Sequence, residues 1–134
     1  MADLIFKDES YKIIGACMDL YNEIGNRFTE PVYQATLEIL FQEREIPYQR
    51  EVYLPIMFHG KKVEKAYKAD FIVYGDIILG LKAVSTITEE HRAQVLNYLY
   101  LTEKPLALLV NFGSSTISYH RFVNSKRGVL LVNL

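Results

Sequence analysis

Apolar residues recur at helical spacing in the first third of the chain. In the first stretch they lie three or four residues apart, at Ile13, Ile14, Cys17, Tyr21 and Ile24. This spacing predicts a helix from Tyr11 to Ile24, with Ser10 as its N-cap and Gly25 at its end. A second helix is predicted from Thr29 to Arg44, and Pro47 lies beyond it.

The hydrophobic period then changes from helical spacing to two. Apolar residues alternate with other residues at Val52, Leu54, Ile56 and Phe58. This alternation predicts a strand, and the turn at residues 59–61 predicts that it pairs with a second strand from Val63 to Tyr74. After a turn at Gly75 and Asp76, the apolar run from Ile77 to Val84 is typical of a central strand.

The last part of the chain alternates helix and strand. Thr88 is a suitable N-cap for a helix from Glu89 to Thr102. The apolar run from Leu106 to Val110 predicts a buried strand that the helix connects to its predecessor as a crossover. A final edge strand is predicted from Thr116 to Phe122, while Leu130 to Leu134 stays ambiguous. The order predicts an α/β domain with a mixed sheet flanked by helices.

Composition narrows the possible classes of protein. The chain has 134 residues, which predicts one domain over residues 1–134, and its net charge is −1. Any nucleic-acid surface must therefore be a local patch. Cys17 is the only cysteine, which excludes an intramolecular disulfide and a thiolate zinc site. The start of the chain carries acidic residues and no long apolar core, and the chain has no run of ~20 apolar residues. We expect a cytoplasmic protein that does not bind membranes.

A cluster of lysines precedes an aspartate in the predicted second strand. Its members are Lys61, Lys62, Lys65 and Lys68, and Asp70 follows them. Such a basic rim could follow a phosphate backbone, with DNA expected in preference to RNA. The alternative is a solvated hairpin edge, where lysines discourage pairing with other strands.

Four short motifs together resemble a known family. They are Arg27-Phe28-Thr29-Glu30-Pro31-Val32-Tyr33, Lys68-Ala69-Asp70-Phe71, Gly80-Leu81-Lys82-Ala83-Val84, and His91-x-x-Gln94-x-x-x-Tyr98-Leu99. In this order they resemble the GxxExxY family, a branch of the PD-(D/E)XK nuclease superfamily, over roughly residues 11–123. The resemblance implies a restriction-endonuclease-like αβββαβ core preceded by an extra helix. The first glycine of the family motif is replaced by Arg27.

The resemblance also implies a metal-dependent nuclease site. Asp70, an acid at position 80 and the main-chain carbonyl of Leu81 would hold Mg²⁺ or Mn²⁺, and Lys82 would orient the attacking water. Here position 80 is Gly80, so one carboxylate is missing. Positions 80 and 82 face the same side of a strand, which explains the acid-x-lysine spacing.

Other residues could replace the missing acid. The resemblance places Glu30 beside the site as a tentative metal ligand, and Gln94 could add a neutral oxygen. Tyr33, His91 and Tyr98 are expected to support the site. Each residue also has a structural explanation. A glycine in a strand often marks a bulge, a strand-end lysine is often simply solvated, and an acid in a first helical turn suits the helix dipole.

Three functions remain open from the sequence. The first is a nuclease whose activity is impaired or lost, with Glu30, Asp70, Lys82 and Gln94 as catalytic residues. The second is a non-catalytic module that binds nucleic acid or protein. The third is a structural domain that forms a homodimer through its tyrosine-rich, apolar surface, because the chain contains 10 tyrosines.

Overall fold

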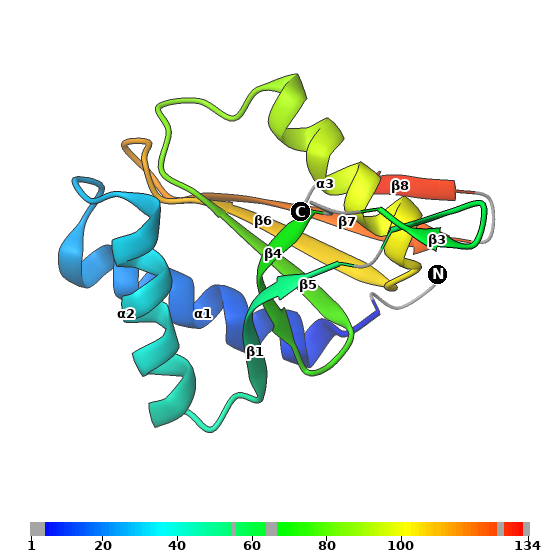
Figure 1. The fold of residues 1–134 in the computed structure, drawn as a ribbon. Helices are drawn as coiled ribbons and strands as arrows, with labels where there is room; N and C mark the ends of the chain where they lie inside the picture. The colour runs from blue at the N-terminus through cyan, green and yellow to red at the C-terminus, as the bar shows by residue number, and fades with distance from the viewer. Residues whose placement is uncertain (1–4, 55, 64–66, 126–127, 133–134) are drawn as a thin grey trace.

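The computed structural model describes residues 5–54, 56–63, 67–125 and 128–132 (Figure 1). Three helices are described: α1 Lys7–Ile24, α2 Glu30–Glu43 and α3 Glu89–Thr102. None of these described helices has both the length and the apolar character needed to cross a membrane. Eight strands accompany them: β1 Tyr48–Tyr53, β2 Met57–Phe58, β3 Lys61–Lys62, β4 Lys68–Val73, β5 Ile77–Lys82, β6 Leu106–Asn111, β7 Ser118–Ser125 and β8 Gly128–Val132.

Six of the strands form one mixed sheet in the order β1-β4-β5-β6-β7-β8. Neighbouring strands are antiparallel except for β5 and β6, which are parallel and are joined through α3. The predicted α/β fold, with a restriction-endonuclease-like mixed sheet between helices, is thus confirmed. Helices α1 and α2 lie on one face of the sheet, and α3 covers the other (Figure 1).

Alternating side chains divide the sheet between two apolar cores. Along β5, Ile77, Leu79 and Leu81 belong to the core under α1 and α2. Ile78 belongs to the smaller core under α3. The same alternation holds in β6, because successive side chains of a strand point to opposite faces. The apolar run in β5 is therefore buried on both faces, as predicted for a central strand.

Helix α1 starts earlier than the sequence predicts. It begins at Lys7, so Ser10 lies within the helix rather than at its N-cap. Ser10 is buried, and its hydroxyl accepts a hydrogen bond of 2.7 Å from the guanidinium of Arg121 on β7. The Ser10 hydroxyl, which the sequence pattern predicts to cap the helix, therefore bonds to Arg121, a residue distant in sequence.

Of the two long strands predicted before residue 75, the first is divided, and the second corresponds to β4 alone, because β3 lies at the predicted turn. β1 pairs with β4, while β2 and β3 form a separate two-stranded sheet. Glu51 in β1 has a φ of 54°, and the pairing of β1 with β4 is interrupted where Glu51 lies opposite Asp70. The alternation of residues 52–58 is thus not one continuous strand, because its second half pairs locally and leaves the main sheet.

The predicted edge strand at residues 116–122 is not at the edge. β7 runs from Ser118 to Ser125, and β8 pairs with its outer side. The ambiguous segment at residues 130–134 therefore contributes to β8, apart from residues 133–134, which lie outside the described residues. By contrast, α3 has the predicted bounds and the predicted Thr88 cap.

Candidate active site

The site forms where β4 and β5 stop pairing. Their antiparallel ladder extends from Val73 and Ile77 to Phe71 and Leu79. One step further, the Leu81 N–H donates to Oδ2 of Asp70 at 2.7 Å. A side-chain carboxylate thus replaces a main-chain partner, which anchors Asp70 between the two strand ends.

Strand alternation places the lysine on the same side as the position of the missing acid. Leu79 and Leu81 point into the α1/α2 core, so Gly80 and Lys82 point to the α3 face. Both are partly exposed there. Lys82 is close enough to Asp70 to lower the pKa of its carboxyl. Asp70 and Lys82 therefore lie on the same face of neighbouring strands, within range of each other's charge.

Opposing effects act on the Asp70 carboxyl. Burial raises its pKa above the ordinary value, and the hydrogen bond from Leu81 N–H acts in the opposite direction. Glu30 raises the pKa further through repulsion, whereas Lys82 and Lys68 lower it. The net effect is a raised pKa, because burial of the carboxyl outweighs the hydrogen bond and the two lysines.

Glu30 reaches the site from the start of α2. It is the first residue of the helix, and Thr29 is the N-cap. The preceding loop is held by Tyr33, whose hydroxyl donates to the carbonyl of Gly25 at 2.5 Å. The ring of Tyr33 is fully buried and stacks on Phe112 at 4.4 Å between centroids. Tyr33 thus holds the loop before α2 and fixes where that helix begins.

Gly80 does not mark a bulge or a close backbone contact. It pairs in regular register with Leu109 of β6. A Cβ added at Gly80 would meet only a methyl group of Leu109 at 3.6 Å and the carbonyl of Leu108 at 4.0 Å. The structural explanation of this glycine is therefore wrong, because a side chain fits at position 80.

A different glycine near Lys82 does have a packing role. A Cβ at Gly113 would lie 2.3 Å from the backbone nitrogen of Val84. The buried side chain of Asn111 bonds the same segment, accepting from Val84 N–H at 3.0 Å and donating to Val84 carbonyl at 2.9 Å. This clamp holds the chain immediately after Lys82.

Helix α3 contributes Tyr98 to the surroundings of Asp70. The side chain of Tyr98 is 8% exposed and packs against Tyr67, with 4.7 Å between ring centroids. Burial, with a smaller contribution from Asp70, raises the pKa of Tyr98 to about 12. The hydroxyl therefore stays protonated at neutral pH.

The other two α3 residues singled out from the sequence lie further along the surface. Gln94 and His91 line a shallow groove of about 320 Å³ with Tyr67. The His91 ring accepts from Thr88 N–H at 3.0 Å, and His91 N–H donates to the Thr88 hydroxyl at 3.3 Å. This capping box accounts for His91 structurally, while Gln94 remains available at the groove.

Comparison with known proteins agrees with this arrangement. The sequence model of the PD-(D/E)XK nuclease superfamily matches residues 7–131. The chain belongs to the PD-(D/E)XK nuclease superfamily. No curated protein is significantly similar to it. The crystal structure of SSO0001 is similar in fold, with a TM-score of 0.53 and 18% identity. That match covers 87% of this chain and 58% of the other, so the chain spans little more than half the length of that protein.

PD-(D/E)XK nucleases generally use divalent metal ions, so the donor set needs to be compared with that requirement. The described residues contain no group of three His, Cys, Asp or Glu side chains placed to hold a metal. Glu30 is within range of Asp70 for its charge to raise the pKa of the Asp70 carboxyl. The Lys82 carbonyl accepts from the N–H of Phe112, the residue after β6, so the preceding Leu81 carbonyl faces the opposite side, toward β4. Two carboxylates and a carbonyl fit a weakly held Mg²⁺.

The predicted lysine rim divides between two elements. Lys61 and Lys62 are exposed on the β2–β3 hairpin. Lys68 begins β4 and lies 3.6 Å from a carboxylate oxygen of Glu51. Lys65 lies outside the described residues. Among the described lysines of the rim, Lys68 is the one whose charge lowers the pKa of Asp70.

Gln34 is a site neighbour that sequence reasoning missed. It is buried, and its side-chain amide donates to the main-chain carbonyl of Asp70 at 3.3 Å. Its own amide oxygen accepts from Arg50 at 3.4 Å. Gln34 lies four residues after Glu30, on the same face of α2, and this spacing could have identified it.

Proposed function

We propose that this protein is a metal-dependent phosphodiester hydrolase acting on nucleic acid, with activity that is weak because position 80 supplies no carboxylate. The observation that carries the proposal is the Asp70 carboxylate bonded to Leu81 N–H, with Glu30 and Lys82 close enough to shift its pKa. The superfamily membership supports the reaction class.

Each residue has a proposed role that follows from its position. Asp70, Glu30 and the carbonyl of Leu81 would hold the divalent ion, Mg²⁺ or Mn²⁺. When bound, the ion polarises the phosphate and lowers the pKa of water. Lys82 lies on the same face as the ion site, where its ammonium donates hydrogen bonds to the attacking water and to phosphate oxygens. Gln94 contributes a neutral oxygen from the adjacent groove.

The variant Gly80→Glu tests the proposal by restoring the missing acid. The space around position 80 admits a side chain, and the new carboxylate would face the side of Asp70 and Lys82. We expect metal affinity and the cleavage rate to rise by about tenfold or more. Removing a group that only orients a metal ligand typically lowers metal affinity or activity by about 10- to 100-fold, and a direct ligand should contribute at least as much. Gly80→Gln has nearly the same size without the charge and should leave both unchanged.

Two measurements compare the position-80 variants with the natural sequence. Calorimetric titration with Mg²⁺ and with Mn²⁺ reports metal affinity independently of turnover. Cleavage of supercoiled plasmid and of circular single-stranded DNA, with and without EDTA, reports activity. If Gly80→Glu and Gly80→Gln behave alike in both assays, the site assignment is wrong.

A second candidate is a non-catalytic nucleic-acid-binding module. It is favoured by the absence, within the described parts of the chain, of three metal-binding side chains in one group. For this function, Asp70→Asn should leave nucleic-acid affinity unchanged or raise it, and no metal should produce cleavage by the natural sequence. Cleavage that depends on both metal and Asp70 would exclude it.

A further inference from the structure

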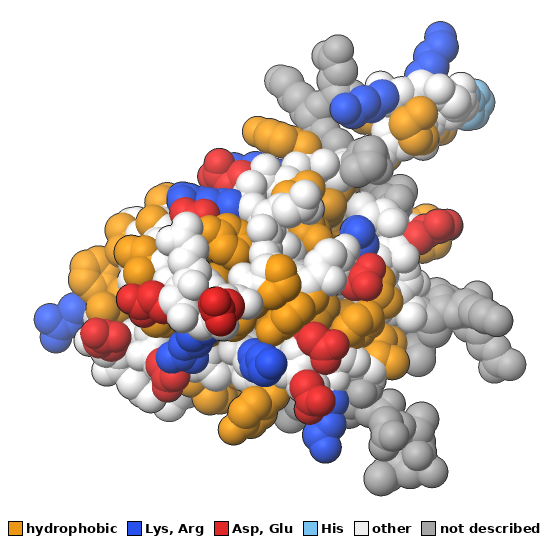
Figure 2. Space-filling model, turned by 90° about the horizontal axis from the view of Figure 1, so that it is seen from below, with side chains coloured by type: hydrophobic (Ala, Val, Ile, Leu, Met, Phe, Trp, Pro, Cys, Tyr) orange, Lys and Arg blue, Asp and Glu red, His pale blue; other side chains and the backbone are white. Residues whose placement is uncertain are grey.

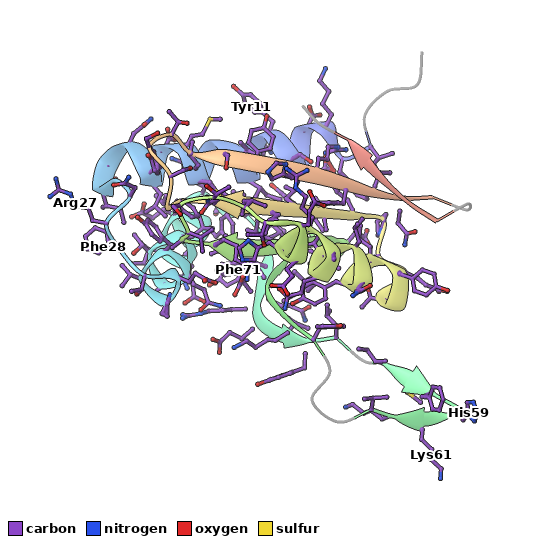
Figure 3. All side chains as sticks on the ribbon, turned by 90° about the horizontal axis from the view of Figure 1, so that it is seen from above. Tyr11, Arg27, Phe28, His59, Lys61 and Phe71 are labelled. Carbon is purple, nitrogen blue, oxygen red and sulfur yellow. The ribbon has the colours of Figure 1, made fainter. Side chains whose placement is uncertain are left out.

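The β2–β3 hairpin, here called the arm, is set apart from the rest of the molecule. It forms its own two-stranded sheet, in which Met57 pairs with Lys62 and Phe58 with Lys61. His59 and Gly60 make the turn, with φ values of 50° and 73° that suit a tight two-residue hairpin turn. The arm projects from the body in views from opposite sides, with basic side chains at its end in Figure 2 and with His59 and Lys61 labelled there in Figure 3.

The arm exposes apolar side chains rather than burying them. Phe58 is 65% exposed and Met57 is 59% exposed. An isolated two-stranded hairpin is only marginally stable in water, and exposed aromatic surface adds no stability to it. Exposure of a large aromatic ring at the end of a projecting element is therefore typical of a contact surface.

The end of the arm combines an aromatic pair with positive charge. The rings of Phe58 and His59 stack at 4.1 Å between centroids, with 12° between their planes. Lys61 lies opposite Phe58, and Lys62 follows it on the same strand. Flat rings beside lysines match the two chemical features of a nucleotide, a base with a π-face and a phosphate with a negative charge.

The base of the arm leads directly to the candidate active site. Leu54 N–H donates to the carbonyl of Tyr67 at 2.7 Å, and Tyr53 pairs with Lys68. Asp70 follows Lys68 by two residues on β4. The shallow groove with Gln94 also begins at Tyr67. A nucleic-acid chain that continues from the arm along its base would therefore run toward the site where we propose cleavage.

We propose that the arm binds an unpaired nucleotide, stacking its base on the Phe58–His59 ring pair while Lys61 and Lys62 contact adjacent phosphates. The choice of nucleic acid as the ligand rests on the proposed function. Bases inside a duplex are already stacked on both faces, so a base that stacks on the arm comes from a single strand or an unstacked step. The arm thus selects single-stranded or distorted nucleic acid over a regular duplex.

Charge favours this occupant over a purely apolar protein partner. The described residues of the arm carry two lysines and no carboxylate, from Ile56 to Val63. A purely apolar partner would gain nothing from two lysines beside the exposed ring, whereas a phosphate backbone would.

Fluorescence anisotropy tests the arm directly. The probes are a fluorescein-labelled single-stranded DNA and a blunt duplex of the same sequence, with EDTA present so that binding is read without cleavage. We expect the natural sequence to bind the single strand more tightly. Phe58→Ala should weaken that binding by about five- to a hundredfold, the range for the loss of one base–aromatic stack, and should change duplex binding little.

Matched variants on the same hairpin separate stacking from other effects. Met57→Ala removes a neighbouring apolar side chain of similar exposure without a ring, and Phe58→Tyr keeps the ring; both should bind like the natural sequence. Lys61→Gln should weaken both probes alike and reduce the slope of affinity against salt by about one. Circular dichroism of each variant confirms that the fold is retained.

The outcomes distinguish this proposal from the proposed function. Equal binding by Phe58→Ala and the natural sequence overturns the arm proposal, even if metal-dependent cleavage is present. Tight single-strand binding lost in Phe58→Ala supports the arm, even if no metal produces cleavage and the proposed function fails. Self-association of the natural sequence that disappears in Phe58→Ala, measured by light scattering without DNA, would assign the arm to a protein interface and overturn the proposal.

Discussion

The two faces of the central sheet are formed by the same strands, but they carry different residues where β4 and β5 separate. Under α1 and α2, Phe71 of β4 and Leu79 and Leu81 of β5 continue an apolar core toward the strand ends. Under α3, Ile72 and Ile78 belong to a smaller core. That core gives way to Asp70, Gly80 and Lys82, which are all partly exposed.

This difference shows how one sheet separates stability from chemistry. The helix-pair face buries its side chains completely, so its contribution is packing energy. The α3 face leaves the end of β4 and β5 uncovered, and there a carboxylate can bond a main-chain N–H without a strand partner. Neighbouring residues on one strand therefore contribute either to stability or to the candidate site. Substitutions on the α1/α2 face should mainly lower stability, and substitutions on the α3 face should mainly affect the candidate site.

The largest expected effect is on the helix-pair face. Phe71→Ala removes a fully buried ring that packs edge-on against Phe41 and Tyr48, and should lower the free energy of unfolding by about 3–5 kcal/mol. Urea denaturation measures this. The control is Lys82→Ala on the other face, expected to change stability by less than about 0.5 kcal/mol. Comparable losses in the two variants would contradict the division between faces.

A smaller loss is expected for Gly113→Ala. The new Cβ would collide with the backbone at Val84, which is clamped by Asn111, so the segment after Lys82 must shift. Overpacking of this kind typically destabilises by about 1–3 kcal/mol. Thermal unfolding measures the loss, and hydrogen exchange at Val84 N–H should accelerate. An unchanged melting temperature would show that this backbone contact is not tight.

Asp70→Asn should stabilise the protein at neutral pH. The folded pKa of Asp70 is raised above its ordinary value of 3.8. As pH rises from about 3.8 through the raised pKa of the folded state, the free energy of unfolding therefore falls. The loss of stability stays at its full size at higher pH, because burying the ionised carboxylate remains unfavourable. The variant, which carries no charge, should melt at a higher temperature at pH 7 and lose this advantage below about pH 3.8. Mg²⁺ should raise the melting temperature of the natural protein only.

The smallest effect is expected for Gly80→Ala. Gly80 pairs regularly in β5 and has room for a Cβ, so alanine reduces the freedom of the unfolded chain without strain. The gain should be about 0.4–1 kcal/mol in urea denaturation. The comparison with Gly113→Ala is the sharpest available, because both variants add one methyl group near Lys82. A clear loss of stability in Gly80→Ala would mean that β5 needs glycine there, and Gly80→Glu would then test nothing.

Local patterns predicted much of the fold correctly. The bounds of α3 follow from the Thr88 cap and the apolar spacing after it, and the end of α1 follows from Gly25, whose φ is 77°. The mixed sheet follows from the order of helices and strands. For the site, the motifs singled out Asp70 and Lys82, and the alternation of strand residues placed Gly80 and Lys82 on one face.

The features that were mispredicted all depend on distant partners. Ser10 is a good cap by its residue type, but Arg121 takes its hydroxyl. Residues 52–58 alternate like one strand, but the ladder with β4 ends at Tyr53 and the arm pairs with itself. The bond from Leu81 N–H to Asp70 and the approach of Gln34 likewise have no signal in their own segments.

The amino-acid sequence by itself therefore determined the types and order of the elements, because helical spacing, caps and strand alternation are properties of neighbouring residues. The tertiary structure alone decided where β4 and β5 separate, that position 80 has room for a side chain, and that Phe58 stands exposed on an arm. Those properties depend on which remote segments pack against each residue, and burial and hydrogen bonding at that level are settled only when the chain is folded.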